Sequence, residues 1–210
     1  MGTEFFDIYD EEWKPAGIAS RADVHAHGWR HMTFHCWVTR REGGRHYVWF
    51  QLRQSSKDTF PDCFDITAAG HLAAGETVRD ALRELKEELG IDAAFESLLP
   101  LGSHDEVTAG TAGGVPFIDH ERSHEFALPV DVPLSSLKLQ HEEVAGVYEA
   151  ELAAVIDLFE GRRSEIIARG VESTASGELL PAKRTVTADR FVPRDGGYYA
   201  ELFRTIRRLT

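Results

Sequence analysis

The chain has 210 residues, of which 42% are apolar and 28% are charged, proportions that fit a folded globular protein rather than a disordered one. Its 35 acidic residues against 23 basic ones give a formal net charge of −12, which argues against a nucleic-acid polymer as a partner. The longest stretch without a charged side chain, residues 107–118, is too short to span a membrane.

The start of the chain and its cysteines favour a cytoplasmic protein. The first residues lack the basic segment followed by an apolar one that marks a secretory signal. Cys36 and Cys63 form neither a C-x-x-C pair nor a dense framework, as is usual in a reducing compartment. A single disulfide between them is the alternative.

Two β-hairpins are predicted in the N-terminal quarter. The first has its turn around Pro15, and the second turns at the glycines of residues 41–45. The strands of the second are rich in aromatic and β-branched side chains, which favour extended structure. The expected strand pairs are residues 5–9 with 18–24, and residues 31–39 with 46–53.

An amphipathic helix is predicted from Thr77 to Leu89, because apolar residues recur there at steps of three and four. Gly90 follows directly and is typical of a helix end. Thr77 and Asp80 resemble a capping box at its start.

The second half of the chain predicts shorter elements, with strands near residues 95–101 and 125–130 on either side of a Gly/Ala/Thr loop at 108–114. Helices interspersed among strands without regular alternation predict an α+β fold with a mixed sheet. The remaining expected elements are a helix over residues 149–169 or one broken near Gly161, a small hairpin within residues 170–197, and a last helix from Tyr198 to Leu209.

Three carboxylates share one face of the predicted helix, because Glu84, Glu87 and Glu88 stand at positions i, i+3 and i+4. Like charges at this spacing cost roughly 0.2–0.5 kcal/mol per pair unless a cation lies among them. Oxygen ligands of this kind suit hard cations such as Mg²⁺ acting together with substrate phosphates. A solvated acidic face balanced by Arg83 and Lys86 is the alternative, and the glycine-bearing loop before the helix favours the metal.

Residues 70–91 resemble the box of the Nudix hydrolases, G-x5-E-x7-R-E-U-x-E-E-x-G-U, where U is aliphatic. Six residues rather than seven separate Glu76 from Arg83. The resemblance implies a Nudix-like α/β/α sandwich over residues 1–165, with residues 166–210 as a C-terminal extension, a small hairpin and a terminal helix packed on that domain. The matching positions are Gly70, Glu76, Arg83, Glu84, Leu85, Glu87, Glu88, Gly90 and Ile91.

The resemblance also implies site residues. Glu84, Glu87 and Glu88 would bind Mg²⁺ or Mn²⁺, with the main-chain carbonyl of Gly70 as a further ligand, while a metal-bound or carboxylate-oriented water attacks the diphosphate. Arg83 would orient Glu84, so the expected catalytic residues are Glu84, Arg83 and Glu87. Glu125, Glu142 and Glu143 are candidates for a further acidic residue that commonly completes such a site.

From about Phe5 to Val147 the chain is similar to the Nudix proteins that resemble isopentenyl-diphosphate isomerase. In those isomerases, histidines matching His25, His31 and His71 bind a second metal together with a glutamate matching Glu125. The expected substrate-binding residues are His71 and the pair Arg53 and Lys57, which match the basic residues that hold the diphosphate.

Two differences favour hydrolysis over isomerisation. The isomerases need a cysteine where this chain has Ala69, and they lack most of the helix carboxylates that this chain keeps. We therefore predict a metal-dependent hydrolase that cleaves the diphosphate of a nucleoside diphosphate linked to another moiety. An isopentenyl-diphosphate isomerase-like enzyme and a noncatalytic nucleotide sensor are the alternatives, and the sequence does not select the small-molecule substrate.

The last predicted helix carries a small basic face of Arg204, Arg207 and Arg208. A solvated surface or a homodimer contact explains this face better than a nucleotide site does.

Overall fold

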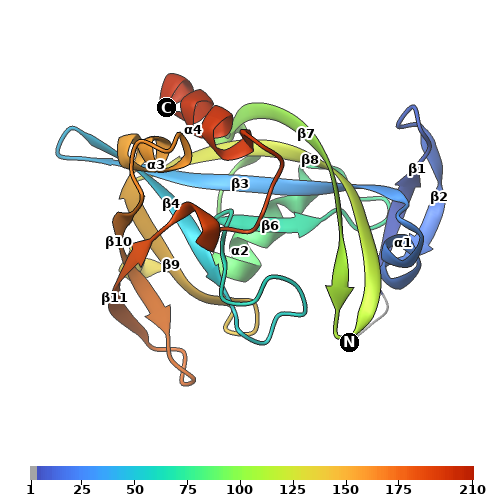
Figure 1. The fold of residues 1–210 in the computed structure, drawn as a ribbon, viewed down its shortest axis with the longest axis horizontal. Helices are drawn as coiled ribbons and strands as arrows, with labels where there is room; N and C mark the ends of the chain where they lie inside the picture. The colour runs from blue at the N-terminus through green and yellow to red at the C-terminus, as the bar shows by residue number, and fades with distance from the viewer. Residues whose placement is uncertain (1–3) are drawn as a thin grey trace.

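The computed structural model describes residues 4–210 (Figure 1). Strand β3 (Arg30–Glu42) lies at the centre of its sheet and pairs with strands on both sides. Along one edge it pairs in parallel with β8 (Val115–Val130). Along the other edge it pairs antiparallel with β6 (Ala68–His71) and then with β4 (Arg45–Arg53). The sheet of eleven strands is therefore mixed, as predicted.

The first hairpin is shorter than predicted. Residues 21–24, expected in its second strand, belong to a helix instead. The Ser20 side chain accepts a hydrogen bond from the Asp23 backbone N–H and so caps the start of this helix, while Val24 packs inward. The bounds are β1 Phe5–Tyr9, β2 Pro15–Ser20 and α1 Arg21–His27.

The second hairpin, β3 with β4, is confirmed. Gly43 and Gly44 form its two-residue turn with φ of +56° and +77°, values that glycine adopts without strain. The strands extend to Glu42 and from Arg45, directly beside the turn.

The acidic helix begins later than predicted. Residues Asp80–Leu82 form a 3-10 turn, and the α-helix α2 covers only Arg83–Leu89. The carboxylate of Asp80 accepts hydrogen bonds from the backbone N–H and hydroxyl of Thr77, as in a capping box. The chain therefore enters α2 through a more extended turn, which advances about 2.0 Å per residue against 1.5 Å in an α-helix.

The prediction of a loop at residues 108–114 is wrong. These residues belong to the long antiparallel ladder of β7 (Leu99–Ala112) with β8, which turns at Gly113 and Gly114. Small, uncharged residues are typical of a loop, and they led to this prediction. In the structure the backbone N–H and C=O groups of β7 and β8 hydrogen-bond to each other along this segment. Residues Phe95–Ser97, expected in a strand, form a 3-10 turn.

The predicted helix over residues 149–169 is also shorter in the structure, because its ends are strands. Residues 149–151 finish β9, which pairs with β4, and residues 166–169 begin β10. Gly161 lies just after the helix with a φ of +72°. The bounds are β5 Phe64–Asp65, β9 Val144–Glu151, α3 Leu152–Phe159, β10 Ile166–Ser173, β11 Leu179–Val186 and α4 Tyr198–Leu209.

Helices cover both faces of the sheet, which confirms the predicted layers (Figure 1). Successive side chains of a strand point to opposite faces, so Phe34 and Cys36 pack against α2, whereas Trp37 packs against Phe203 of α4. Residues 166–210 extend the sheet beyond β9 and share the core that contains Trp37.

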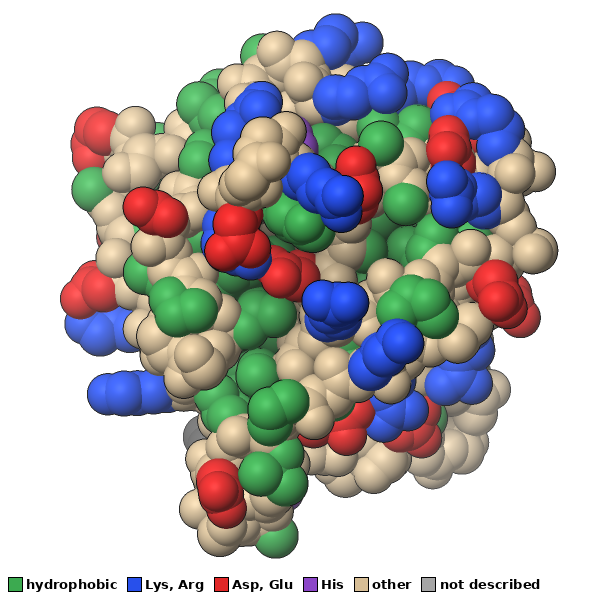
Figure 2. All heavy atoms as spheres, turned by 90° about the vertical axis from the view of Figure 1, so that its left-hand side faces the viewer, with side chains coloured by type: hydrophobic (Ala, Val, Ile, Leu, Met, Phe, Trp, Pro, Cys, Tyr) green, Lys and Arg blue, Asp and Glu red, His purple; other side chains and the backbone are tan. Residues whose placement is uncertain are grey.

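Lys and Arg side chains gather on the upper part of the face in Figure 2, where α4 ends. Arg204 of this helix pairs with Glu160, and Arg208 donates to Thr205. Cys36 and Cys63 are both free thiols. Within residues 4–210, no helix has the length and apolar character needed to cross a membrane.

Candidate active site

The three helix carboxylates differ in exposure. Glu88 points into the protein and is only 6% exposed, whereas the side chain of Glu87 is 56% exposed. Glu84 lies between these extremes, with 13% of its side chain exposed. The short helix therefore carries acidic groups from the interior to the surface along one side.

Arg83 joins the loop to the helix. Its guanidinium donates to both carboxylate oxygens of Glu76 at 2.9 and 3.1 Å, to the main-chain carbonyl of His71 at 3.2 Å, and to Glu84. A longer contact of 3.5 Å reaches Glu87. Glu76 also accepts a hydrogen bond from the Ala73 N–H. Glu76 thus anchors Arg83 despite the shorter spacing in the sequence.

Gly70 provides the space that Glu84 occupies. A Cβ atom at this position would lie 2.2 Å from both Cδ and Oε1 of Glu84, a separation that two nonbonded atoms do not adopt. Only glycine lets the helix carboxylate lie directly over strand β6. The structure therefore places Glu84 directly beside Gly70, two residues that the resemblance implies are metal ligands.

Two of the carboxylates are more basic than usual. Burial raises the pKa of Glu84 to about 7, although Arg83 acts in the opposite direction. Burial also raises the pKa of Glu88 well above its ordinary value, and the charges of Glu84 and Glu143 add to this effect. A bound cation would remove both penalties, so these residues fit a divalent metal ion.

The two basic residues expected to hold a diphosphate have partners within the chain. Arg53 donates to Asp65 at 2.9 Å and to the carbonyl oxygens of Thr59 and Phe60, while Lys57 pairs with Glu143. The Arg53 side chain is 16% exposed and the Lys57 side chain 27% exposed. Two acidic candidates lie outside the box in this region. Glu143 is close enough to Glu88 for its charge to raise the pKa of Glu88, whereas Glu142 is exposed.

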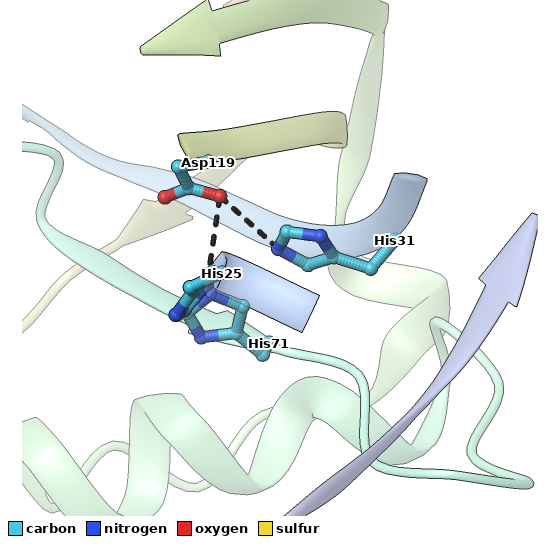
Figure 3. Close-up of side chains that lie close together, drawn as sticks. All are labelled: His25, His31, His71 and Asp119. Atoms are coloured by element: carbon cyan, nitrogen blue, oxygen red, sulfur yellow. Dashed lines mark ion pairs between the residues drawn. The ribbon is translucent and has the colours of Figure 1, made fainter. Parts of the chain in front are cut away.

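A second cluster lies on the opposite face of β6, because the side chains of Gly70 and His71 alternate. His71, His31 and His25 converge there with Asp119 of β8 (Figure 3). Their ligand atoms all lie within 4.8 Å of one another, and Asp119 Oδ1 is 3.2 Å from His31 Nε2 and 3.6 Å from His25 Nε2. The ring of Phe6 stacks on His71 and covers the cluster.

Two of the three histidines in this cluster favour the neutral form that binds metal. Burial lowers the pKa of His25 and lowers that of His71 strongly, which favours the neutral, metal-binding form. Burial lowers the pKa of His31 as well, but the Asp119 carboxylate beside its Nε2 outweighs burial and raises this pKa, while Nδ1 lies 3.1 Å from the Trp29 carbonyl oxygen. Within residues 4–210, the buried Nε2 atoms of all three histidines and Asp119 Oδ1 have no hydrogen-bond partner, a pattern that fits metal ligands.

The structure places Asp119, rather than Glu125, beside the three histidines. Glu125 lies opposite His35 in the β3–β8 ladder, and its Oε1 accepts hydrogen bonds from His35 Nδ1 at 3.0 Å and from the hydroxyls of Ser123 and Tyr198 at 2.8 Å. Asp119 could not be predicted from the sequence, since only the parallel register of β8 with β3 brings it to His31.

The chain is similar to known Nudix proteins over most of its length. The NUDIX domain model matches residues 29–169. An uncharacterized Nudix hydrolase from Clostridium acetobutylicum is 37% identical over 207 residues, 98% of each chain. An isopentenyl-diphosphate Delta-isomerase from Brevibacterium linens is 34% identical over 90 residues, which cover 42% of this chain and 48% of the isomerase.

The fold has a counterpart among solved structures. The crystal structure of DR0079 from Deinococcus radiodurans superposes with a TM-score of 0.57 at 19% identity, covering 75% of this chain and 90% of that one. The match over residues 29–169 and the full-length similarity to the Clostridium relative show that this chain belongs to the NUDIX domain family.

Proposed function

We propose that the protein is a Mg²⁺- or Mn²⁺-dependent hydrolase that cleaves the diphosphate of a nucleoside diphosphate linked to another moiety. The observation that carries this proposal is the set of carboxylates on α2, in which burial makes Glu84 and Glu88 unfavourable as bare anions. A divalent ion held there would neutralise diphosphate oxygens and activate a water molecule.

The chain's own residues have separate tasks in this proposal. Glu84, Glu87 and Glu88 hold the ion, and the Gly70 carbonyl is a further ligand candidate. Arg83, fixed by both oxygens of Glu76, keeps the Glu84 carboxylate over β6. Glu87 is the most exposed of the three and is suited to meet water and substrate at the surface.

Lys57 would bind the substrate's phosphates directly, and Arg53 would assist it. Lys57 could exchange Glu143 for a phosphate at little cost, since both side chains of this pair are partly exposed. Arg53 is tied to Asp65 and to two loop carbonyls, so its contribution to substrate binding would come from its charge and its hold on the loop.

The residue at position 69 supports hydrolysis over isomerisation. Ala69 pairs with His35 in the sheet and packs against the apolar cluster that includes Tyr198 and Tyr199. A methyl group at this position has no proton to exchange with a substrate carbon, which an allylic isomerisation requires.

The cluster of His25, His31, His71 and Asp119 would hold a second metal ion. Its three imidazoles and one carboxylate are ligands that suit Zn²⁺ or Mn²⁺. The site is on the face of β6 opposite to Glu84, so it would support the strand that carries Gly70.

The test is turnover on a panel of sugar nucleotides, dinucleotides, oxidised nucleotides and prenyl diphosphates, with Mg²⁺ or with chelator. We expect metal-dependent release of a nucleotide or phosphate product, which Glu84→Gln lowers by at least about 100-fold. Glu96→Gln is the matched control, because this exposed glutamate pairs with Arg79 at the surface. Binding without cleavage, turnover in chelator, or an isomerised product would refute the proposal.

A further inference from the structure

Gln51 is a buried polar residue in an otherwise apolar stretch of β4. Residues 48–52 read V-W-F-Q-L, and the Gln51 side chain is only 4% exposed. Burying an amide without a partner costs about 1–3 kcal/mol, so a glutamine in this position needs a specific contact. Its Nε2 donates to Glu88 Oε2 at 3.5 Å, across the space between the sheet and α2.

The surroundings of Glu88 show why this donor matters. Glu88 is only 6% exposed, and among the described residues Gln51 is the one side chain that donates a hydrogen bond to its carboxylate. Lys57, the basic residue expected near this site, is paired with Glu143. Gln51 therefore supplies a side-chain donor to a carboxylate that the fold has removed from water.

A neutral donor suits a metal ligand better than a cation does. An amide N–H orients a carboxylate and occupies one lone pair, but it leaves the negative charge intact for the metal. A lysine or arginine in the same place would compete with the ion by neutralising that charge. A glutamine at this position therefore suits the Glu88 carboxylate, which must keep its negative charge and its orientation to bind a metal ion.

The support is also rigid. Gln51 lies in the interior of the sheet, with Val147 of β9 on one side and Asp65 of β5 on the other. The helix that carries Glu88 is held against the same sheet by Leu85 and Leu89, which are fully buried. Both ends of the contact are therefore fixed by packing, as a well-defined metal site requires.

We propose that Gln51 is a positioning residue that orients the Glu88 carboxylate for the divalent ion. This inference rests on the proposed function, in which Glu88 is a metal ligand. Gln51 itself touches neither the metal nor the substrate and acts only through Glu88.

The experiment measures Mn²⁺ affinity by electron paramagnetic resonance of the free ion, after one equivalent of Zn²⁺ has been added to occupy the histidine cluster. Gln51→Met keeps the length of the side chain and removes the donor. We expect Mn²⁺ to bind about tenfold more weakly to this variant than to the wild type, the lower end of the range for residues that support metal ligands. Thermal unfolding of the metal-free proteins reports whether the fold is intact.

A double-mutant cycle separates positioning from general damage to the site. In a Glu88→Gln background, Gln51→Met should weaken Mn²⁺ binding no further, because its effect passes through the carboxylate. Thr67→Val is the matched control, since Thr67 is buried in the short connection between β5 and β6 and donates to the Trp49 carbonyl rather than to a helix carboxylate. It should lower the melting temperature and leave Mn²⁺ affinity unchanged.

Two results would overturn the inference in distinguishable ways. In the first, Glu88→Gln weakens Mn²⁺ binding, but Gln51→Met either has no effect or has the same effect with and without Glu88→Gln. The positioning role is then refuted, and the proposed function stands. If Glu88→Gln leaves Mn²⁺ affinity unchanged, the metal assignment fails and the inference fails with it.

Discussion

Gly70→Ala tests whether the catalytic carboxylate depends on its position over β6. The added Cβ would lie 2.2 Å from Cδ and Oε1 of Glu84, about 1.2 Å closer than ordinary contact at 3.4 Å. The carboxylate must therefore move by about this distance. The backbone of β6 beneath it cannot move instead, because it is hydrogen-bonded to β3. A displacement near 1 Å at a reacting centre can reduce a rate about 100-fold.

The cost in stability should be much smaller than the cost in rate. Glu84 is the end of a flexible side chain that can turn toward solvent, so we expect about 1 kcal/mol, the low end for overpacking. In a chain of this size that lowers the melting temperature by about 2–4 °C. The assay is kcat on the substrate found in the panel, together with thermal unfolding.

Gly196→Ala is the control for Gly70→Ala, because nothing lies within 4 Å of a Cβ atom at Gly196 and the residue has no positive φ. It should change neither the rate nor the melting temperature. A Gly70→Ala enzyme that keeps kcat within threefold of the wild type would refute the reasoning, as would a loss of rate that merely follows unfolding at the assay temperature.

Three further predictions concern pH, metal content and the C-terminal segment. Because burial raises the pKa of Glu84 from 4.5 to about 7, its contribution to metal-free stability is complete below pH 4.5 and is lost as pH rises through 7. Glu84→Gln should thus be more stable than the wild type at pH 8 in chelator, by up to about 3 kcal/mol, with no difference at pH 4; equal melting curves at pH 8 would contradict this. Asp119→Asn should lower the Zn²⁺ retained after dialysis, measured by atomic emission, whereas Asp105→Asn at an exposed ion pair should not; unchanged retention in both would exclude the histidine cluster as the site. Arg194→Met should cost about 3–5 kcal/mol in chemical unfolding, because it leaves the buried Glu106 carboxylate without its cation, and a loss below 1 kcal/mol would show that the pair is dispensable.

Much of the carboxylate site was predictable because its residues are close in sequence. Glu84, Glu87 and Glu88 share a face through the period of the helix alone, and Arg83 and Gly70 belong to the same short motif. The start of the α-helix was not predictable in the same way. Thr77 to Leu82 has the apolar pattern of a helix, yet the chain makes a 3-10 turn there that holds Glu76 against Arg83.

The strands were predictable only where side-chain composition matched their environment. The aromatic and β-branched residues of β3 and β4 indicated a buried hairpin, which the structure confirms. The end of the β7–β8 ladder has small, uncharged and largely exposed residues, so nothing in its pattern distinguishes it from a loop. Its hydrogen bonds come from register with a neighbouring strand, which is a property of pairing rather than of local sequence.

The sequence by itself determined the family, the helix that bears three carboxylates and the glycine on which Glu84 rests, since helical period and backbone freedom are local properties. Only the tertiary structure decided that Asp119 joins His25, His31 and His71 and that Gln51 meets Glu88. These contacts join residues that are 37 or more positions apart, and they depend on the register of parallel and antiparallel strands. Register is set by the packing of the whole sheet, so no short segment of the chain encodes it.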